Sequence, residues 1–508
     1  MIKIVEGRKG VVFTPVFSPE KTLGIYIQVP FCQTRCTYCN FHTGVASPAA
    51  YAPYARTVER EIREWRGLHA AAGLDSATQF ARTDDASHPD PEPGRSVDRG
   101  EESAFETTNQ QQKQISRHRP PSAGEPLLGM TAASQNDVLP ADTVYLGGGT
   151  PSLFDPADLA RILDAVRSQF GTNRTRSATA GPVNGPLETK GATPGASRTG
   201  AGSTGSAGPT IEITLEADPE TITSEKAAAW LAAGINRISL GAQSFHDAEL
   251  KAAGRMHRRS DIFSAIDCLR AAGFGDISLD LIAGLPHQTD ASWQASVEEA
   301  LQLRPEHISI YLFEIDEGSR LGRELLSGGS RYSAGAVPSD DAMAESYEFA
   351  CDALARAGYE HYEISNWALP GFRSRHNLKY WRREPYLGFG AGAHSFDGRW
   401  RWANAHDPAA YAAAIEQGRL PVEQLEEVTP KQALEEELFL GLRQLEGVDL
   451  AEIAARYGAR FENGFRAALD ARIQDLAAQG LVECEGSRVR LAPARLAISN
   501  EVFVALLD

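Results

Sequence analysis

The sequence predicts an α/β protein: an incomplete barrel of six β/α units, open on one side, followed by a small α+β domain. Short runs of strand-forming residues alternate six times with amphipathic helical patterns, which predicts a parallel sheet with helices outside. Near-continuous apolar strands such as Ile277 to Gly284 indicate a sheet covered on both faces. Ligand-binding loops are then expected at the carboxyl ends of the strands.

The expected elements follow one another in a regular order. The strand-forming runs are Gly24 to Val29, Thr143 to Leu146, Ile211 to Ala217, Asn236 to Ala242, Ile277 to Ala283 and His307 to Phe313. The helical patterns are Ser47 to Leu68, Pro156 to Phe170, Ser224 to Ala233, Ser260 to Ala272, Ser292 to Leu303 and Asp340 to Ala357.

Two stretches interrupt this order. The first, at about 70–140, is rich in Ser, Gln, Asp, Pro and Arg, and the second, at 171–210, consists largely of Gly, Ser, Thr, Ala and Pro. Neither holds enough apolar surface to offset the entropy of ordering, so we expect disordered insertions. The predicted large domain therefore spans 1–428 with these two interruptions, and a small domain spans 429–508.

The small C-terminal domain shows helical patterns at 433–445, 450–458 and 465–480, and a hairpin pattern at 481–492. Helices followed by a hairpin predict a winged-helix-like module. Such modules often bind DNA, but three consecutive glutamates near the start of the first helix oppose that function. The other cysteines, Cys268, Cys351 and Cys484, lie in periodic segments and are expected to be core or incidental thiols.

Composition narrows the function classes. The 508 residues carry a net charge of −17, with a pI near 5.3, which opposes the basic surface of a nucleic-acid binder. No apolar run approaches the ~18 residues that span a bilayer, and the first ten residues lack a secretory signal's apolar region. Six cysteines in so long a chain do not form a disulfide framework. We therefore expect a cytoplasmic protein.

The most informative stretch follows the first strand, where Cys32, Cys36 and Cys39 stand in a C-x3-C-x2-C spacing. Structural zinc sites and ordinary electron-transfer clusters use four protein ligands, so three thiolates leave one position open. A cubane iron–sulfur cluster held this way has one iron free for a chelating ligand such as the amino and carboxylate groups of a methionine. Alternatives are a zinc site completed by His42, or three unrelated cysteines.

Further polar residues occur at or beyond the ends of later strands. Gly147 to Thr150 form a turn that lets backbone approach a ligand closely. Glu216, Gln243, Arg255 and Asp280 follow in order. Each alone would more often be a cap or a surface charge, but together they favour a polar lining for ribose, adenine and amino-acid groups.

Together, the cysteine loop and the motifs GGGTP, LEADP, SLGAQSF and LIAGLP resemble the radical S-adenosylmethionine (SAM) proteins related to oxygen-independent coproporphyrinogen III oxidase. The resemblance covers most of residues 20–400 apart from the insertions. It implies a radical SAM partial (β/α)6 barrel in which the cysteines bind a [4Fe-4S] cluster and the C-terminal module caps the opening. It also implies SAM contacts by Tyr26, Gly148, Gly149, Thr150, Glu216, Gln243, Arg255 and Asp280. Gln28 departs from the histidine common in relatives.

Two branches of this family differ in a few residues. The oxidase branch has a fourth cysteine where Phe41 stands here, whereas the heme-chaperone branch lacks it and carries an H-N-x-x-Y-W motif, which residues 376–381 match in full. His376 is the first candidate for heme contact, because a neutral imidazole can bind heme iron. A histidine satisfied by hydrogen bonds is the structural alternative. His394, in a glycine-rich segment, is a second candidate ligand.

The sequence and its resemblance thus lead to one hypothesis. We expect a heme chaperone that holds a [4Fe-4S] cluster with SAM and delivers heme to acceptor proteins, membrane respiratory enzymes among them. The resemblance also implies an electron donor and a scaffold able in principle to cleave SAM, without coproporphyrinogen oxidase activity. The alternative is that oxidase, which decarboxylates propionates of coproporphyrinogen III. No nucleic-acid partner is expected.

Overall fold

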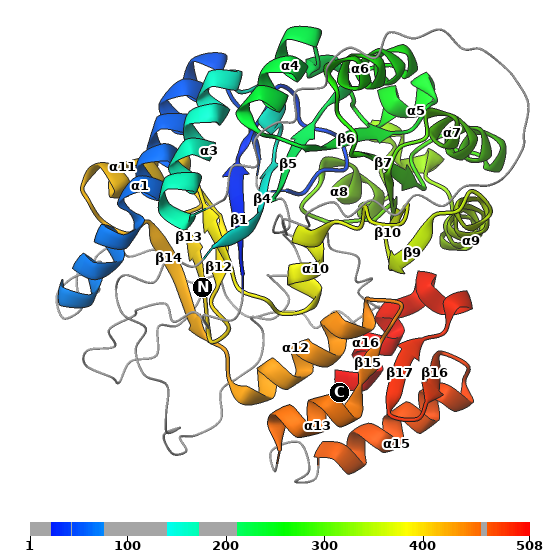
Figure 1. Cartoon of the computed structure of the whole chain (residues 1–508). Coiled ribbons are helices and arrows are strands. Elements are labelled where there is room, and N and C mark those ends of the chain that lie inside the picture. The colour runs from blue at the N-terminus through cyan, green and yellow to red at the C-terminus, as the bar shows by residue number, and fades with distance from the viewer. Residues whose placement is uncertain (1–21, 42, 76–139, 172–210, 459–464, 508) are drawn as a thin grey trace, which may run out of the picture.

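A twelve-stranded sheet forms the centre of the computed structural model, which describes residues 22–41, 43–75, 140–171, 211–458 and 465–507 (Figure 1). Its order is β14-β13-β12-β11-β1-β4-β5-β6-β7-β8-β10-β9. Six neighbouring strands pair in parallel, namely β1 (Leu23–Val29), β4 (Ala141–Gly148), β5 (Glu212–Ala217), β6 (Arg237–Gln243), β7 (Ile277–Ala283) and β8 (His307–Leu312). These are the six predicted strands, and they form the predicted incomplete barrel.

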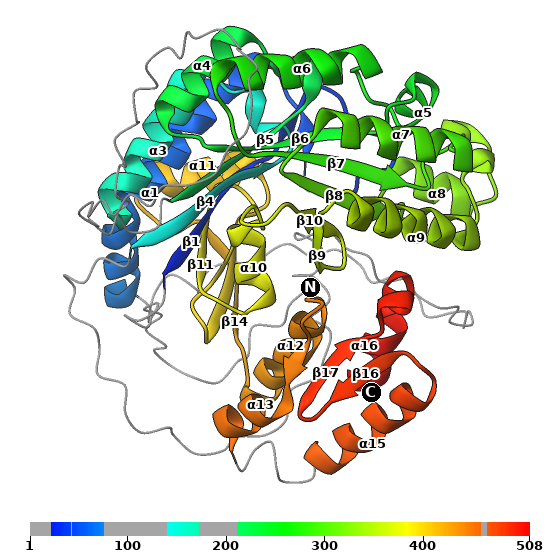
Figure 2. The ribbon, with the colours of Figure 1, turned by 45° about the vertical axis from the view of Figure 1, so that its right-hand side comes forward.

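Helices cover the outer face of these strands (Figure 2). They are α1 (Tyr51–Asp75), α3 (Pro156–Phe170), α4 (Ser224–Ala233), α6 (Arg259–Ala272), α7 (Asp290–Leu303) and α9 (Asp340–Arg356). Helices α5 (Asp247–Ala252) and α8 (Arg320–Leu326) instead lie beside the cysteine loop, where Ala253 and Leu321 bond to the backbone of Thr37. Local residues fix several ends: Asp155 caps the start of α3 ahead of Pro156, and Gly234 ends α4 with a φ of 95° that favours glycine.

The two faces of the strands differ in chemistry. The outward side chains pack with the helices into one apolar core that includes Ile25, Trp230 and Trp293. Because side chains alternate along a strand, the next residues face inward, and nearly all of them are polar or glycine. The inward residues that line the barrel's cavity are Tyr26, Tyr145, Glu216, Ser239, Gly241, Gln243, Asp280, Ile282 and Tyr311.

The sheet is wider than the sequence predicts. On the β1 side it continues through β11 (Tyr386–Phe389), parallel to β1, and then through antiparallel β12 (His394–Phe396), β13 (Trp400–Asn404) and β14 (Val422–Glu427). On the β8 side it gains antiparallel β10 (Asn366–Ala368) and β9 (Glu360–Glu363). Helices α10 (Arg375–Trp381) and α11 (Pro408–Glu416) lie in the same part of the chain.

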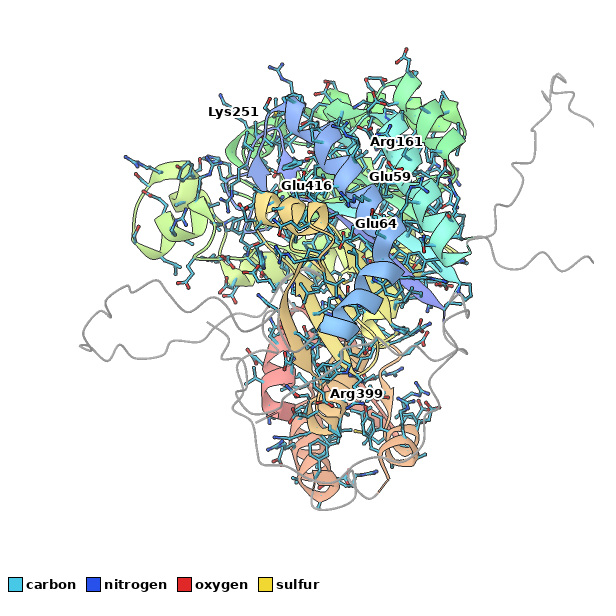
Figure 3. The ribbon with its side chains drawn as sticks, turned by 90° about the vertical axis from the view of Figure 1, so that its left-hand side faces the viewer. Glu59, Glu64, Arg161, Lys251, Arg399 and Glu416 are labelled. Carbon is cyan, nitrogen blue, oxygen red and sulfur yellow. The ribbon has the colours of Figure 1, made fainter. Side chains whose placement is uncertain are left out.

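Helix α1 is longer than predicted. It continues to Asp75 after the short helix η1 (Pro48–Ala50), so the predicted end at Leu68 and the start of the first insertion at residue 70 are wrong. The rest of both predicted insertions lies outside the described residues, apart from their flanking positions. Glu59 on α1 binds Arg161 on α3 at 3.3 Å, which joins the two helices at the surface (Figure 3).

A small α+β unit ends the chain, beside α10 (Figure 2). Its elements are α12 (Pro430–Leu442), β15 (Val448–Asp449), α13 (Leu450–Tyr457), α15 (Phe465–Ala478), β16 (Val482–Glu485), β17 (Arg488–Leu491), η6 (Pro493–Ile498) and α16 (Ser499–Leu507). The three predicted helices and the hairpin are present, and β15 and α16 add to them. Across the described residues, no helix combines the length and apolar character needed to span a bilayer.

The remaining short elements surround the barrel opening. They are β2 (Phe31–Cys32), β3 (Gly44–Val45), η3 (Pro151–Leu153), η4 (Pro219–Thr221) and η5 (Arg331–Ala336). Strands β2 and β3 pair in parallel and close the cysteine loop at its base.

Candidate functional site

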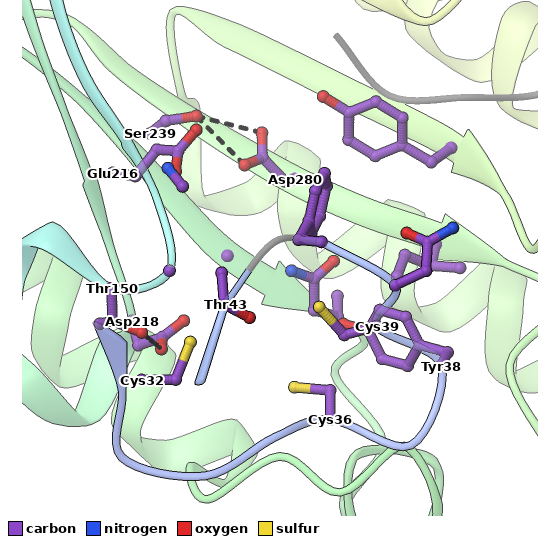
Figure 4. Close-up of a pocket in the computed structure, with 18 of the residues that line it drawn as sticks. Cys32, Cys36, Tyr38, Cys39, Thr43, Thr150, Glu216, Asp218, Ser239 and Asp280 are labelled. Atoms are coloured by element: carbon purple, nitrogen blue, oxygen red, sulfur yellow. Dashed lines mark hydrogen bonds between the residues drawn. The ribbon is translucent and has the colours of Figure 1, made fainter. Parts of the chain in front are cut away.

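One cavity of about 300 Å³ runs inside the barrel. All twelve residues that the sequence singles out line it: Tyr26, Cys32, Cys36, Cys39, Gly148, Gly149, Thr150, Glu216, Gln243, Arg255, Asp280 and His376. Figure 4 shows the three thiols on one side of this space and Glu216, Ser239 and Asp280 on the other. The part near the thiols is called the cysteine end below, and the part near His376 the α10 end.

At the cysteine end, the loop after β1 is held by its backbone. The N–H of Thr37 donates to the carbonyl of Ala253 at 3.0 Å, and the carbonyl of Thr37 accepts from the N–H of Leu321 at 2.9 Å. The guanidinium of Arg35 donates to the carbonyl of Cys39 at 3.4 Å. Segments distant in sequence thus fix the loop through its backbone.

Burial makes the thiols of Cys32 and Cys39 poor anions. It raises the pKa of Cys39 to about 11, with the neighbouring Cys36 adding to the effect, and it also raises the pKa of Cys32. A cation is needed to stabilise thiolates in such a place. The guanidinium of Arg255 supplies part of that charge, with its Nη1 3.6 Å from the Sγ of Cys36.

The donor set can be compared with the metal centres expected from the sequence. Among the described residues, no three His, Cys, Asp or Glu side chains gather closely enough to hold a single metal ion. A zinc site completed by His42 stays a prediction, because His42 lies outside the described residues. Three thiols that line one cavity are the donor set of a cubane cluster, in which each of three thiolates binds a different iron.

The glycine turn after β4 brings the cysteine loop close to the sheet. The N–H of Gly149 donates to the carbonyl of Val29 at 2.6 Å, and that of Thr150 to the carbonyl of Phe31 at 2.8 Å. A Cβ on Gly149 would overlap the backbone of Phe31. Gly148 has a φ of 111°, which favours glycine. The turn therefore positions the cysteine loop through its backbone.

The carboxylates beside this turn are partly buried and hydrogen-bonded. Glu216 accepts from the N–H of Gly148 at 2.9 Å, and burial raises its pKa to about 8 despite hydrogen bonds from Tyr145 and Gly148. Asp280 accepts from the hydroxyl of Ser239 at 3.1 Å (Figure 4), and burial raises its pKa too.

A carboxylate and a backbone carbonyl orient the guanidinium of Arg255. Its guanidinium pairs with Asp218 and donates to the carbonyl of Gly241 at 3.0 Å, while Thr150 donates to the same Asp218 carboxylate at 3.0 Å. Gln243, the last residue of β6, has a φ of 64°, a strained conformation for a residue other than glycine. Such strain is common at ligand sites.

At the α10 end, His376 is buried and both its ring nitrogens are hydrogen-bonded. Nδ1 lies 2.9 Å from the hydroxyl of Thr143, and Nε2 lies 2.9 Å from that of Tyr380. The imidazole stacks on Tyr145, with the ring centroids 5.2 Å apart. Burial lowers its pKa to about 3, so the ring is neutral at physiological pH. Ligation of iron through Nε2 would require the hydroxyl of Tyr380 to move.

Backbone contacts hold α10 against the starts of the strands. The carboxylate of Glu212 accepts from the N–H groups of Arg375 and His376, both at 2.9 Å. Lys379 binds Asp142 at 2.9 Å and Glu384 at 3.1 Å. His376 therefore lies at the amino ends of β1 and β4, whereas the thiols lie beyond their carboxyl ends.

Several cavity residues were not predicted. Tyr145 lies between the two ends of the cavity, because it hydrogen-bonds to Glu216 and stacks on His376. Its alternation with Gly147 in the second strand could have indicated that its side chain points inward. Asp218 stands two positions after Glu216 in the LEADP motif. Arg443 comes from the C-terminal unit, and no local sequence signal marks it.

The remaining sequence candidates are placed differently. His394 lines the cavity at the start of β12. Gln28 is buried, does not line the cavity, and packs its amide against Gly148. Cys268 and Cys351 are partly buried on α6 and α9, and Cys484 is exposed on β16. None of these three cysteines lines the cavity.

Comparisons with known proteins agree with this architecture. Residues 111–300 match the radical SAM superfamily and residues 428–494 match the HemN C-terminal domain. The first match begins after the cysteine loop. The solved structure of coproporphyrinogen III oxidase (HemN) from Escherichia coli has the same fold, with a TM-score of 0.66 and 18% identity over 96% of this chain and 91% of that one. The fold and the two family matches together define this chain as a radical SAM protein of the HemN-like type.

Similar proteins whose family is known identify the branch of this class to which the chain belongs. The heme chaperone HemW of Bacillus subtilis is 33% identical over 72% of this chain and 85% of that relative. The heme chaperone HemW of Mycobacterium tuberculosis is 29% identical over 96% of both chains. The mouse mitochondrial radical S-adenosyl methionine domain-containing protein 1 is 30% identical over 96% of this chain and 89% of its own length. The chain belongs to the HemW family.

Proposed function

We propose that this chain is a cytoplasmic heme chaperone that binds heme in its barrel cavity and passes it to acceptor proteins, membrane respiratory enzymes among them. In this proposal Cys32, Cys36 and Cys39 hold a [4Fe-4S] cluster, and SAM lies across the strand ends. The observation that carries the proposal is that one cavity is lined both by the three thiols and by His376, Tyr380 and Trp381 of the HNLKYW motif.

The side chains have separate tasks in this function. The thiols lose their protons to bind iron, and Arg255 offsets the negative charge beside Cys36. Tyr26, Gly148, Gly149, Thr150, Glu216, Gln243 and Asp280 provide the polar surface for SAM. When bound and reduced by an electron donor, the cluster and SAM would supply one-electron chemistry.

The α10 end suits the heme itself. Tyr145 and Tyr380 present aromatic surface beside His376, with ring centroids 5.2 and 5.1 Å from the imidazole. A neutral imidazole is the form that binds heme iron, and the low pKa of His376 keeps it in that form. Iron binding exchanges the hydrogen bond between Nε2 and Tyr380 for a bond to the metal.

Parallel heme titration and coproporphyrinogen turnover test the proposal on the full chain after anaerobic cluster reconstitution. We expect tight heme binding and no protoporphyrinogen formation in the presence of SAM and a reductant. Decarboxylation at an enzyme-like rate would instead assign the alternative function of coproporphyrinogen oxidase.

His376→Gln tests the heme contact. Glutamine can retain hydrogen bonds to Thr143 and Tyr380 but cannot replace imidazole as an iron ligand, so we expect at least about tenfold weaker heme binding, or about 1.4 kcal/mol. The matched control is His307→Gln: His307 is also buried, with both ring nitrogens 2.8 Å from hydroxyl groups, but it does not line the cavity. Equal heme affinity of His376→Gln and wild type would refute His376 as the ligand.

A further inference from the structure

A buried arginine of the C-terminal unit reaches the same cavity. Arg443 caps the end of α12 and is only 5% exposed. Its carbonyl accepts from the N–H of Ile364 at 3.1 Å, which ties it to the turn between β9 and β10. Its guanidinium carbon lies 4.6 Å from the ring centroid of Trp381, the last residue of α10. Arg443 thus brings a cation from the C-terminal unit to the wall of the barrel cavity.

This cation has no ion pair at contact distance, although the carboxylates of Glu363 and Glu314 attract it from farther away. Within the described part of the chain, no carboxylate lies within 4.0 Å of the guanidinium of Arg443, and its Nε has no hydrogen-bond partner. Among the described residues, the other arginine less than 9% exposed is Arg237, whose Nε also lacks a hydrogen-bond partner but which has the carboxylate of Asp276 at 3.6 Å. Since a buried charge is costly unless it is closely paired, these more distant carboxylates leave Arg443 without the contact partner that its position calls for.

A second donor lies beside it. The indole Nε1 of Trp381 is buried and has no hydrogen-bond partner among the described residues, and Trp381 also lines the cavity. The nearby carboxylate of Glu363 is not a contact-distance counter-ion for Arg443. It is fully buried and accepts from the side chain of Asn366 and the N–H of Ser365. Two unpartnered donors on one wall of a cavity favour an anionic ligand group.

We propose that Arg443 and Trp381 form an anion subsite that binds a carboxylate of the cavity's ligand, namely a propionate of heme. This inference rests on the proposed function, since heme has carboxylates at one edge of a flat ring. A planar guanidinium can hold a carboxylate through two parallel hydrogen bonds, and the tryptophan adds a donor and a flat surface. The subsite makes heme binding depend on the C-terminal unit.

The test compares heme with heme dimethyl ester, whose propionates carry no charge. Wild-type full-length chain is titrated with both compounds, and we expect it to bind heme at least tenfold more tightly than the ester. Arg443→Gln should weaken heme binding at least tenfold and ester binding less than twofold, which removes the preference. Arg443→Lys keeps the charge without the planar fork and should retain part of the preference.

Arg382→Gln is the matched control. Arg382 follows Trp381, is exposed, and donates to Gln444, the neighbour of Arg443, at 3.3 Å. We expect this variant to keep the wild-type preference for heme. Thermal unfolding of each variant checks that it is folded.

The outcomes separate this subsite from the proposed function. Equal wild-type affinity for heme and ester, or an Arg443→Gln variant that keeps the preference, would overturn the subsite alone. SAM binding is measured in parallel, because SAM also has a carboxylate. If Arg443→Gln weakens SAM binding and leaves heme binding unchanged, the assignment to a propionate is wrong. A wild-type chain that binds neither heme nor its ester would overturn the proposed function together with the subsite.

Discussion

At the cysteine end of the cavity, backbone hydrogen bonds fix the loop that carries the three thiols, whereas at the α10 end both nitrogens of His376 are hydrogen-bonded at 2.9 Å. The first arrangement suits a resident cofactor, because distant segments of the chain hold the loop that carries its ligands. The second suits a transient ligand, since the hydrogen bond to Tyr380 can re-form when the ligand leaves. The difference shows how one cavity can combine a site for a resident cofactor with a site for a transient ligand.

The largest expected effect lies at the cysteine end. Cys36→Ser removes one of three thiolate ligands, so iron and sulfide bound per chain after anaerobic reconstitution should fall to near zero. Cys268→Ser is the matched control, because Cys268 lies on α6 and does not line the cavity. If Cys36→Ser retains the wild-type iron content, the cluster assignment is wrong.

Gly149→Ala tests whether the cysteine end depends on backbone packing. The added methyl group would overlap the backbone of Phe31, so we expect the free energy of unfolding to fall by about 1–3 kcal/mol. Chemical denaturation measures this change. Gly275→Ala is the control, since nothing lies within 4 Å of a Cβ added there. A Gly149→Ala variant as stable as the control would contradict the packing described here.

The pH dependence of stability distinguishes the two ends. The pKa of Glu216 is raised to about 8, so its contribution to stability is full below its unfolded pKa of about 4.5 and is lost as the pH rises to 8. The pKa of His376 is lowered to about 3, so its contribution is present above about 6.5 and is lost as the pH falls towards 3. Between pH 6.5 and 8, only Glu216 of these two residues changes its contribution to stability.

Between pH 6.5 and 8, the free energy of unfolding of the wild type should fall by about 2 kcal/mol, at about 1.4 kcal/mol per pH unit. Glu216→Gln should remove this loss. His376→Gln should keep the wild-type slope in this range and reduce the loss of stability below pH 6.5. Denaturation at a series of pH values measures both. A Glu216→Gln variant with the wild-type slope above pH 6.5 would show that this carboxyl is not the titrating group.

Local signals explain which parts of the fold the sequence predicts. Pro156–Phe170 and Ser224–Ala233 have the predicted bounds, because a capping residue starts each helix and a glycine follows its end. The strands at the sheet edges were not predicted. They have only three to six residues, too few to show a clear alternating pattern. Strands β11 and β10 join the central strands β1 and β8, which are distant in the chain, whereas the other edge pairs are between strands that neighbour each other in sequence.

The same reasoning applies to the site. The cysteine spacing is local and therefore visible, and the structure brings the twelve residues that the sequence singles out to one cavity. The hydrogen bond of His376 to Thr143 joins residues 233 positions apart, and Arg443 enters from another folding unit, so neither was predictable from local patterns. Roles that depend on tertiary contacts need the structure.

The smallest expected effect most directly probes exchange at the α10 end. Tyr380→Phe removes the hydroxyl that occupies Nε2 of His376 but keeps the aromatic ring. If heme iron must displace this hydrogen bond, the variant should bind heme up to about tenfold more tightly, because a buried hydrogen bond contributes about 0.5–1.5 kcal/mol. Heme titration of both chains measures the gain. Combining Tyr380→Phe with His376→Gln should abolish it, and a gain that persists in the double variant would show that Tyr380 acts on heme without His376.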